Sequence, residues 1–238
     1  MFPPKLIATS VVRGAQQGQS HGGVYLIDFA HREVQQVVDW NTGDIDFTGR
    51  GWDRGLRGIA FHGGEVYIAA SDELFVYDRV FRIVRSFRNR YLKHCHEISA
   101  YEGRLFVAST GFDSLLRFDP QTQRFDWALH IAEGQEGWAG RVYDPNGPAG
   151  PPLQNLLHLN NVHAEQSGLY LSGMRTRARG GVKHAIDRRP ATGNAHIIHG
   201  GGMGLVGRRI SGNGERRRLC RQPHQKKCRH SAKHGPTP

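Results

Sequence analysis

The chain has 238 residues, with 32 Lys and Arg against 21 Asp and Glu. Its charge is unevenly distributed: residues 1–175 hold 17 basic and 19 acidic residues, whereas residues 176–238 hold 15 and 2. The last aromatic residue is Tyr170, so the C-terminal part lacks the large side chains from which a core is built. Composition therefore divides the chain into a core-forming part, residues 1–175, and a basic, aromatic-free tail, residues 176–238.

Membrane and secretory classes are excluded on the same grounds. No apolar run is long enough to span a bilayer, and the N-terminus lacks the charged start and long apolar stretch of a secretory signal. The three cysteines, Cys95, Cys220 and Cys228, imply no disulfide framework and fit a reducing compartment. These features predict a cytoplasmic protein with no membrane partner.

Short strand patterns follow one another through residues 1–175, and no stretch has the spacing of a helix. The apolar runs are bounded by Gly, Asp, Ser or Asn, and residues 134–152, rich in Gly and Pro, are expected to form a loop between two units. In chain order the predicted strands are 6–12, 24–29 and 33–38; then 57–61, 65–70, 73–78 and 82–87; then 96–100, 103–109, 114–119 and 124–129; then 160–164 and 168–173. The sequence therefore predicts an all-β protein.

The predicted strands repeat with a period of about 40 residues, which is the length of one propeller blade. Residues 57–87 form a four-stranded meander, residues 96–129 repeat it strand for strand, and residues 160–173 begin a further copy. Residues 6–38 match the second to fourth strands and lack the first, which the C-terminus of a closed propeller usually supplies. We expect a partial β-propeller, about three to four blades of a six- or seven-bladed ring; a β-sandwich of the same hairpins is the alternative.

The strand pattern stops after Arg175, where Arg, Gly, His and Pro replace the third and fourth strands expected in that copy. We interpret residues 176–238 as a non-globular tail, either disordered or the product of a shifted reading frame, because GC-rich codons read out of frame give such a composition. Residues 1–175 are then an incomplete, truncated propeller. Its open apolar blade faces and strand edges predict low stability.

Propellers commonly bind ligands where the innermost strands begin, because these strands line the central channel and reach its mouth. Arg57 could hold a carboxylate or a phosphate there, and Glu97, Asn161 and His163, together with His96, could hold a divalent cation. The alternative is that these side chains bond only the backbone ends of neighbouring blades or channel water. The candidate mouth residues are Arg57, His94, His96, Glu97, Asn160, Asn161 and His163, with His158 just upstream of the last three.

Two features of the tail point to other chemistry. Four candidate metal ligands lie close together, but Lys226 and Lys227 stand between them, and their spacing is unlike that of paired zinc ligands. Runs of Arg and Lys could bind nucleic acid by charge alone, since no aromatic residue is present to stack on bases. The four candidate ligands are Cys220, His224, Cys228 and His230.

Five stretches of the sequence carry a resemblance to known proteins: residues 20–28, 54–61, 91–98, 109–114 and 159–163. On these stretches the chain resembles a family of bacterial propeller-like proteins with no established reaction, and this resemblance implies a six- or seven-bladed ring. A more distant similarity to gluconolactonase-like and NHL-type propellers implies a divalent cation at the channel mouth. Its counterparts here are Glu97, Asn160 and Asn161, whereas the Asp partners from later blades are absent.

These observations favour a propeller that binds a small polar ligand or a protein partner. One alternative is an enzyme, a metal-dependent, lactonase-like hydrolase in which Glu97 and Asn161 hold the metal and His96 or His163 is the general base. Another alternative is non-specific nucleic-acid binding by the tail. No phosphate-binding Gly-rich loop and no serine-hydrolase motif points to a particular reaction.

Overall fold

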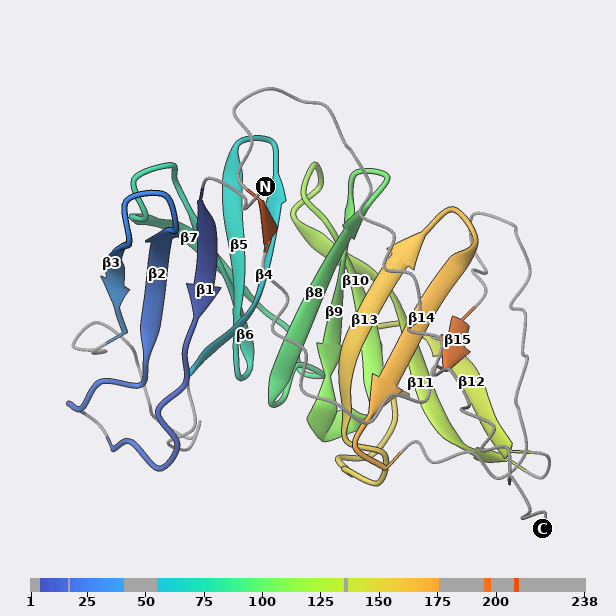
Figure 1. Ribbon diagram of the computed structural model, residues 1–238. Helices are drawn as coiled ribbons and strands as arrows, with labels where there is room; N and C mark the ends of the chain where they lie inside the picture. Colours follow the sequence, from blue (N-terminus) through green and yellow to red (C-terminus); the bar gives the residue numbers. More distant parts are fainter. Residues whose placement is uncertain are drawn as a thin grey trace, which may run out of the picture.

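The computed structural model describes residues 5–16, 18–40, 55–134 and 137–175, together with two short strands at 195–197 and 208–209. These residues form four sheets, which lie side by side in chain order (Figure 1) and are named blades A to D from the N-terminus. Apart from one short 3-10 helix, η1 (Thr110–Phe112), the regular structure is all strand. The all-β prediction is confirmed. Within this part of the chain, no helix has the length and apolarity needed to cross a membrane.

Blade A contains the partial copy predicted at the N-terminus. Its strands are β1 (Leu6–Thr9), β2 (Gly23–Asp28), β3 (Glu33–Asp39) and the two-residue β16 (Arg208–Arg209). β16 pairs antiparallel with β1, so the sheet order is β16-β1-β2-β3. A strand from the C-terminal part of the chain therefore lies where the repeats lack a first strand.

Blades B and C are meanders, as predicted. Blade B contains β4 (Leu56–His62), β5 (Glu65–Ala70), β6 (Glu73–Tyr77) and β7 (Ile83–Arg88). Blade C contains β8 (Cys95–Tyr101), β9 (Arg104–Ser109), β10 (Ser114–Asp119), β11 (Arg124–Gly134) and β12 (Gly137–Tyr143). The fifth strand, β12, corrects the expectation of a loop over residues 134–152. Its glycines gave no alternation to detect, and its pairing with the long β11 makes it a strand.

Blade D begins with the predicted hairpin of β13 (Leu159–Glu165) and β14 (Gly168–Gly173). Its third strand is β15 (Ala195–Ile197), which runs parallel to β14, whereas the third strand of a meander would run antiparallel. The sequence after Arg175 predicted no strand, because apolar alternation is absent there. Pairing of the β15 backbone with β14 is a tertiary contact that periodicity does not report.

The core consists of three apolar clusters, one at each boundary between neighbouring blades. Alternate residues of a single strand feed different clusters: in β5, Val66 and Ile68 pack toward blade A, whereas Tyr67 and Ala69 pack toward blade C. Blade B is therefore buried on both faces. Sheets that pack face to face in chain order, with their first strands innermost, form a partial β-propeller.

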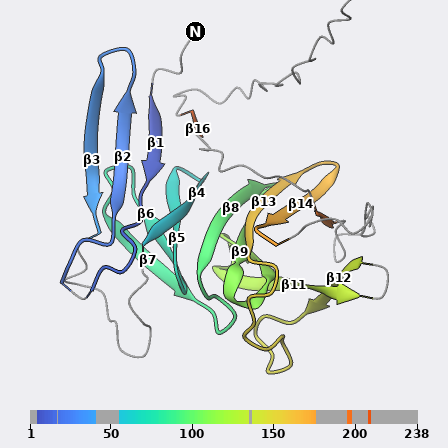
Figure 2. The same cartoon turned by 60° about the horizontal axis from the view of Figure 1, so that its bottom comes forward.

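The first strands of three blades, β4, β8 and β13, lie next to one another (Figure 2). Gly58 permits the close approach of β4 to β8, because a Cβ atom at this position would lie 2.3 Å from the His96 carbonyl oxygen. The Ala164 N–H donates to Ser99 Oγ at 2.9 Å and joins β13 to β8. These contacts bring the starts of three innermost strands together.

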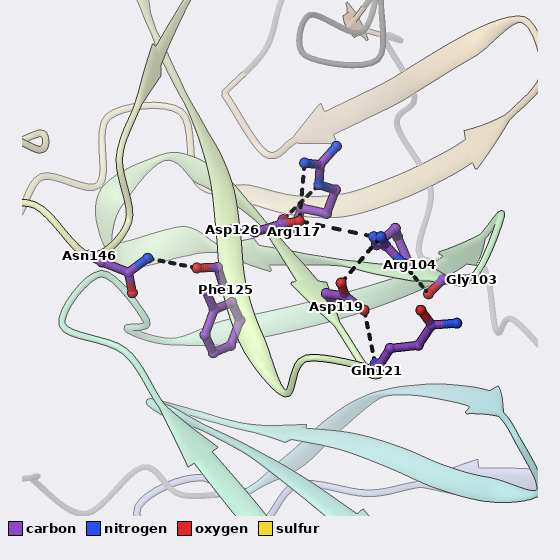
Figure 3. A network of polar contacts seen from close by, with 8 residues as sticks. All are labelled: Gly103, Arg104, Arg117, Asp119, Gln121, Phe125, Asp126 and Asn146. Carbon is purple, nitrogen blue, oxygen red and sulfur yellow. Dashed lines mark hydrogen bonds and ion pairs between the residues drawn. The ribbon is translucent and has the colours of Figure 1, made fainter.

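A polar ladder crosses blade C at the far end of the sheet from the start of β8 (Figure 3). Arg117 Nε donates to Asp126 Oδ1 at 2.7 Å, and Arg104 Nη2 lies 3.2 Å from Asp119 Oδ2. The ladder links β9, β10 and β11 by cross-strand ion pairs. Its charges are paired with one another, so it stabilises the sheet and is not a candidate ligand site.

Candidate ligand site at the starts of the inner strands

A β-bulge interrupts each of the three inner strands near its first residue. The register shifts lie between Leu56 and Ile59 in β4, between Cys95 and Ile98 in β8, and between Leu159 and Asn161 in β13. A bulge leaves extra residues outside the ladder and re-aims their side chains. The residues within the three bulges are Arg57 and Gly58, His96 and Glu97, and Asn160, which include four of the predicted site residues.

Two histidines precede the inner strands in an unusual conformation. His94 has φ 51° directly before β8, and His158 has φ 54° directly before β13. This left-handed region is costly for residues other than glycine, although His enters it more often than most. The same turn in two successive blades places a histidine at each strand entry.

Arg57, His96 and His158 come together from blades B, C and D. Arg57 Nη1 lies 3.3 Å from His96 Nε2. A guanidinium only donates, so Nε2 is the acceptor and the His96 proton is on Nδ1. The His96 and His158 rings meet edge to face, with their centroids 5.7 Å apart.

The surroundings of His96 keep its ring neutral. Burial lowers the pKa of His96 to about 3, and the electrostatic effects of Arg57, His158, His94 and Arg13 act in the same direction. The pKa of His158 is also lowered, first by burial and then by Arg175, against an opposing effect of Asp113. The ring of His96 is therefore neutral near pH 7, and the arginines around it favour this neutral form.

Asp113 holds the segment that carries His158 in place. Its buried carboxylate accepts the backbone N–H groups of Leu156, Leu157 and Leu159 at 2.6, 2.9 and 3.2 Å. Because this carboxylate is bonded to three main-chain donors, its role is to fix the entry to β13 against blade C. Thr110 Oγ1 donates to the Leu159 carbonyl at 2.6 Å and strengthens the same link.

The structure does not assemble the predicted metal set of Glu97, Asn161 and His163. His163 is 64% exposed on the outer face of blade D, where its Nε2 lies 3.8 Å from Glu165 Oε2. Asn161 shares that face because strand residues alternate, whereas Glu97 accepts the Ile98 N–H at 3.1 Å. Among the described residues, no three His, Cys, Asp or Glu side chains are grouped to hold a metal ion.

Two further predicted site residues lie near the strand starts. Asn160 lies in the β13 bulge, and His94 lies beside His96 and contributes to its electrostatic environment. Sequence reasoning missed Arg13 and Arg175, because neither occupies a repeated position. The tail residues Cys220, His224, Cys228 and His230 lie outside the described residues.

Comparisons with known proteins give low similarities. No family model and no curated protein matches the chain. Among solved structures, the AfRom2 CNH domain is 14% identical with a TM-score of 0.35, over 50% of this chain and 43% of that one. A chain of the mitotic checkpoint complex is 12% identical with a TM-score of 0.38, over 63% and 51%. The chain thus spans about half the length of each of these two.

A glutaminyl cyclase from Myxococcus xanthus is also similar, at 12% identity and a TM-score of 0.34, over 72% of this chain and 93% of that one. Similarities this low assign neither a family nor a function. The function of the chain must therefore be inferred from its own residues.

Proposed function

We propose that the protein binds a small anionic ligand, a carboxylate or a phosphate, at the starts of β4, β8 and β13, with Arg57 as the main anchor. The observation that carries this proposal is the convergence of Arg57, His96 and His158 from three successive blades. Each of these residues lies in, or directly before, a strand start that carries a β-bulge. The same backbone irregularity therefore positions one side chain of the site in each of the three blades.

The chemistry of the cluster favours an anion over a cation. A planar guanidinium matches carboxylate and phosphate oxygens, and its charge persists at every physiological pH. One group in contact with Arg57 is a neutral histidine, which accepts a hydrogen bond from the guanidinium and carries no negative charge of its own. Arg13 and Arg175 add to the field around the histidines.

The test is calorimetric titration of the full chain with inorganic phosphate and with citrate. We expect Arg57→Gln to weaken binding about tenfold or more, the usual effect of removing one partner of a close charge pair. Arg124→Gln, which removes an exposed arginine from β11, is the matched control and leaves binding unchanged. Equal affinity in both variants would refute the site.

The composition of residues 176–238, 15 basic residues against 2 acidic, supports a second proposal: non-specific binding of nucleic acid by the tail. The affinity of such a tail for a single-stranded oligonucleotide falls steeply as salt rises. Deletion of residues 176–238 removes that binding while phosphate binding at Arg57 persists. An oligonucleotide affinity that is insensitive to salt would contradict this proposal.

A further inference from the structure

The outer strand of blade B, β7, has one side facing away from its sheet. It is last in the order β4-β5-β6-β7, and among the described residues its backbone pairs only with β6. From Arg85 to Arg88 the pairing with β6 is regular, whereas the register shifts at Val84. Beyond the bulge, β7 therefore offers a short, regular strand edge with backbone donors and acceptors.

Positive charge is concentrated along this strand. Residues 78–90 hold five arginines against one acidic residue, Asp78. Only Arg85 is half-buried, with its Nη2 2.6 Å from Glu65 Oε2. The exposed arginines are Arg79, Arg82, Arg88 and Arg90, which lie toward the two ends of the strand.

Apolar side chains lie between these arginines. Val80, Ile83 and Val84 are 67%, 48% and 47% exposed. Exposed valine and isoleucine next to a strand edge favour association with another strand. Charged residues alone would only protect the edge, so the apolar residues need a separate explanation.

The outer edge of blade A shows that arginine does not line every outer strand edge among the described residues. β3 is also the last strand of its sheet, and its ends carry Glu33 and Asp39, with Gln35 and Gln36 between. The two neighbouring blades thus present outer edges of opposite charge. The basic edge of β7 is a local property of blade B.

We propose that the β7 edge binds an extended, acidic segment of a partner protein as an added strand. Backbone hydrogen bonds to residues 85–88 supply affinity, acidic side chains meet the flanking arginines, and apolar side chains cover Val80, Ile83 and Val84. This surface is separate from the Arg57 cluster, which lies at the innermost strand of the blade, and the two proposals stand or fall independently.

The experiment measures binding of a fluorescein-labelled acidic peptide, Glu-Val-Glu-Val-Glu-Val-Glu, to the full chain by anisotropy. Two further peptides carry N-methyl groups at every second residue, one in each register, and so lose the donors along one side of the strand. We expect one register to bind about tenfold more weakly than the parent, because its blocked side faces β7.

Two charge-reversal variants locate the site on the protein. Arg82→Glu combined with Arg90→Glu is expected to weaken binding about tenfold. Arg124→Glu combined with Arg141→Glu changes the same charge at exposed positions of β11 and β12 in blade C, and is expected to change binding less than about twofold. Circular dichroism establishes that both variants are folded.

The proposal is overturned if both N-methylated peptides bind like the parent, if the blade C variant weakens binding as much as the blade B variant, or if the parent peptide does not bind. A thymidine oligonucleotide of equal charge serves as a competitor. If it displaces the peptide at equal concentration, the surface recognises polyanions in general and strand addition is wrong.

Discussion

Blades B and D start from the same strand pattern but differ in how many of their faces are buried. In blade B, every residue from Val66 to Tyr77 on β5 and β6 is buried, five of the apolar side chains against blade A and four against blade C. In blade D, Val162 and Ala164 pack against blade C, whereas Asn161 and His163 are exposed on the opposite face.

This difference shows that the sequence pattern of a strand reports how many of its faces are buried. A strand buried on both faces has a continuous apolar run, and a strand buried on one face alternates. The open blade faces were expected to be apolar. For blade D this is wrong, because its outer face carries Asn161, His163 and Tyr170. For blade A, Val34 is 65% exposed, in line with the expectation.

The largest expected effect lies at the boundary between blades B and C. Gly58→Val places a side chain against the β8 backbone, since even a Cβ atom would lie 2.3 Å from the His96 carbonyl and 2.6 Å from the Ile98 nitrogen. We expect Gly58→Val to lower the free energy of unfolding by about 4 kcal/mol or to prevent folding. Asn161→Val on the exposed face of blade D is the control, and urea titration measures both. Similar stabilities would contradict the two-faced burial of blade B.

The second-largest loss of stability is expected from a large-to-small substitution in the core of blade B. Leu74 is fully buried between blades B and C, and Leu74→Ala is expected to cost about 3 kcal/mol from lost burial and the cavity left behind. His163→Ala in blade D is expected to cost less than about 0.5 kcal/mol. The midpoints of chemical unfolding compare the two. A costly His163→Ala would show that the outer face of blade D is covered.

The third prediction concerns pH. Folding lowers the pKa of His96 from 6.5 to about 3, so between these values the unfolded chain binds a proton that the folded chain does not. Stability is therefore lost as the pH falls below about 6.5, on the order of 3 kcal/mol by pH 4. His96→Asn removes this part of the pH dependence, and thermal melts from pH 7 to 4 measure it. His163→Asn is the control in blade D, and an unchanged slope in His96→Asn would refute the assignment.

The smallest effect is expected at partly exposed ion pairs. Glu65 accepts from Arg85 at 2.6 Å and from the Tyr67 hydroxyl at 2.9 Å. Because solvent screens this pair, Glu65→Gln should cost less than about 1 kcal/mol. Glu165→Gln in blade D should cost nothing measurable. A loss above that of Leu74→Ala would mean that polar contacts outweigh the apolar clusters in blade B.

Sequence reasoning reached most of the fold and part of the site. Short apolar runs, continuous in β5 and β6 and alternating in the hairpin of blade D, located all four strands of blade B and that hairpin, because each strand there has at least one apolar face. Arg57, His94 and His96 were located by aligning the strand starts of successive copies. β12 and β15 were missed because pairing with β11 and β14, and not side-chain pattern, makes them strands. Arg13 and Arg175 lie outside the repeated positions, so alignment of copies could not find them.

The sequence alone determined the all-β class, the blade repeat and the separation of a neutral core-forming part from a basic tail, because these properties follow from the local order of apolar and charged residues. Only the tertiary structure decided which strand starts meet. The bulges of β4, β8 and β13 and the close approach at Gly58 bring Arg57 to His96 and His158, and send His163 to the opposite face. Such contacts join residues far apart in the chain, and their geometry depends on how whole blades pack.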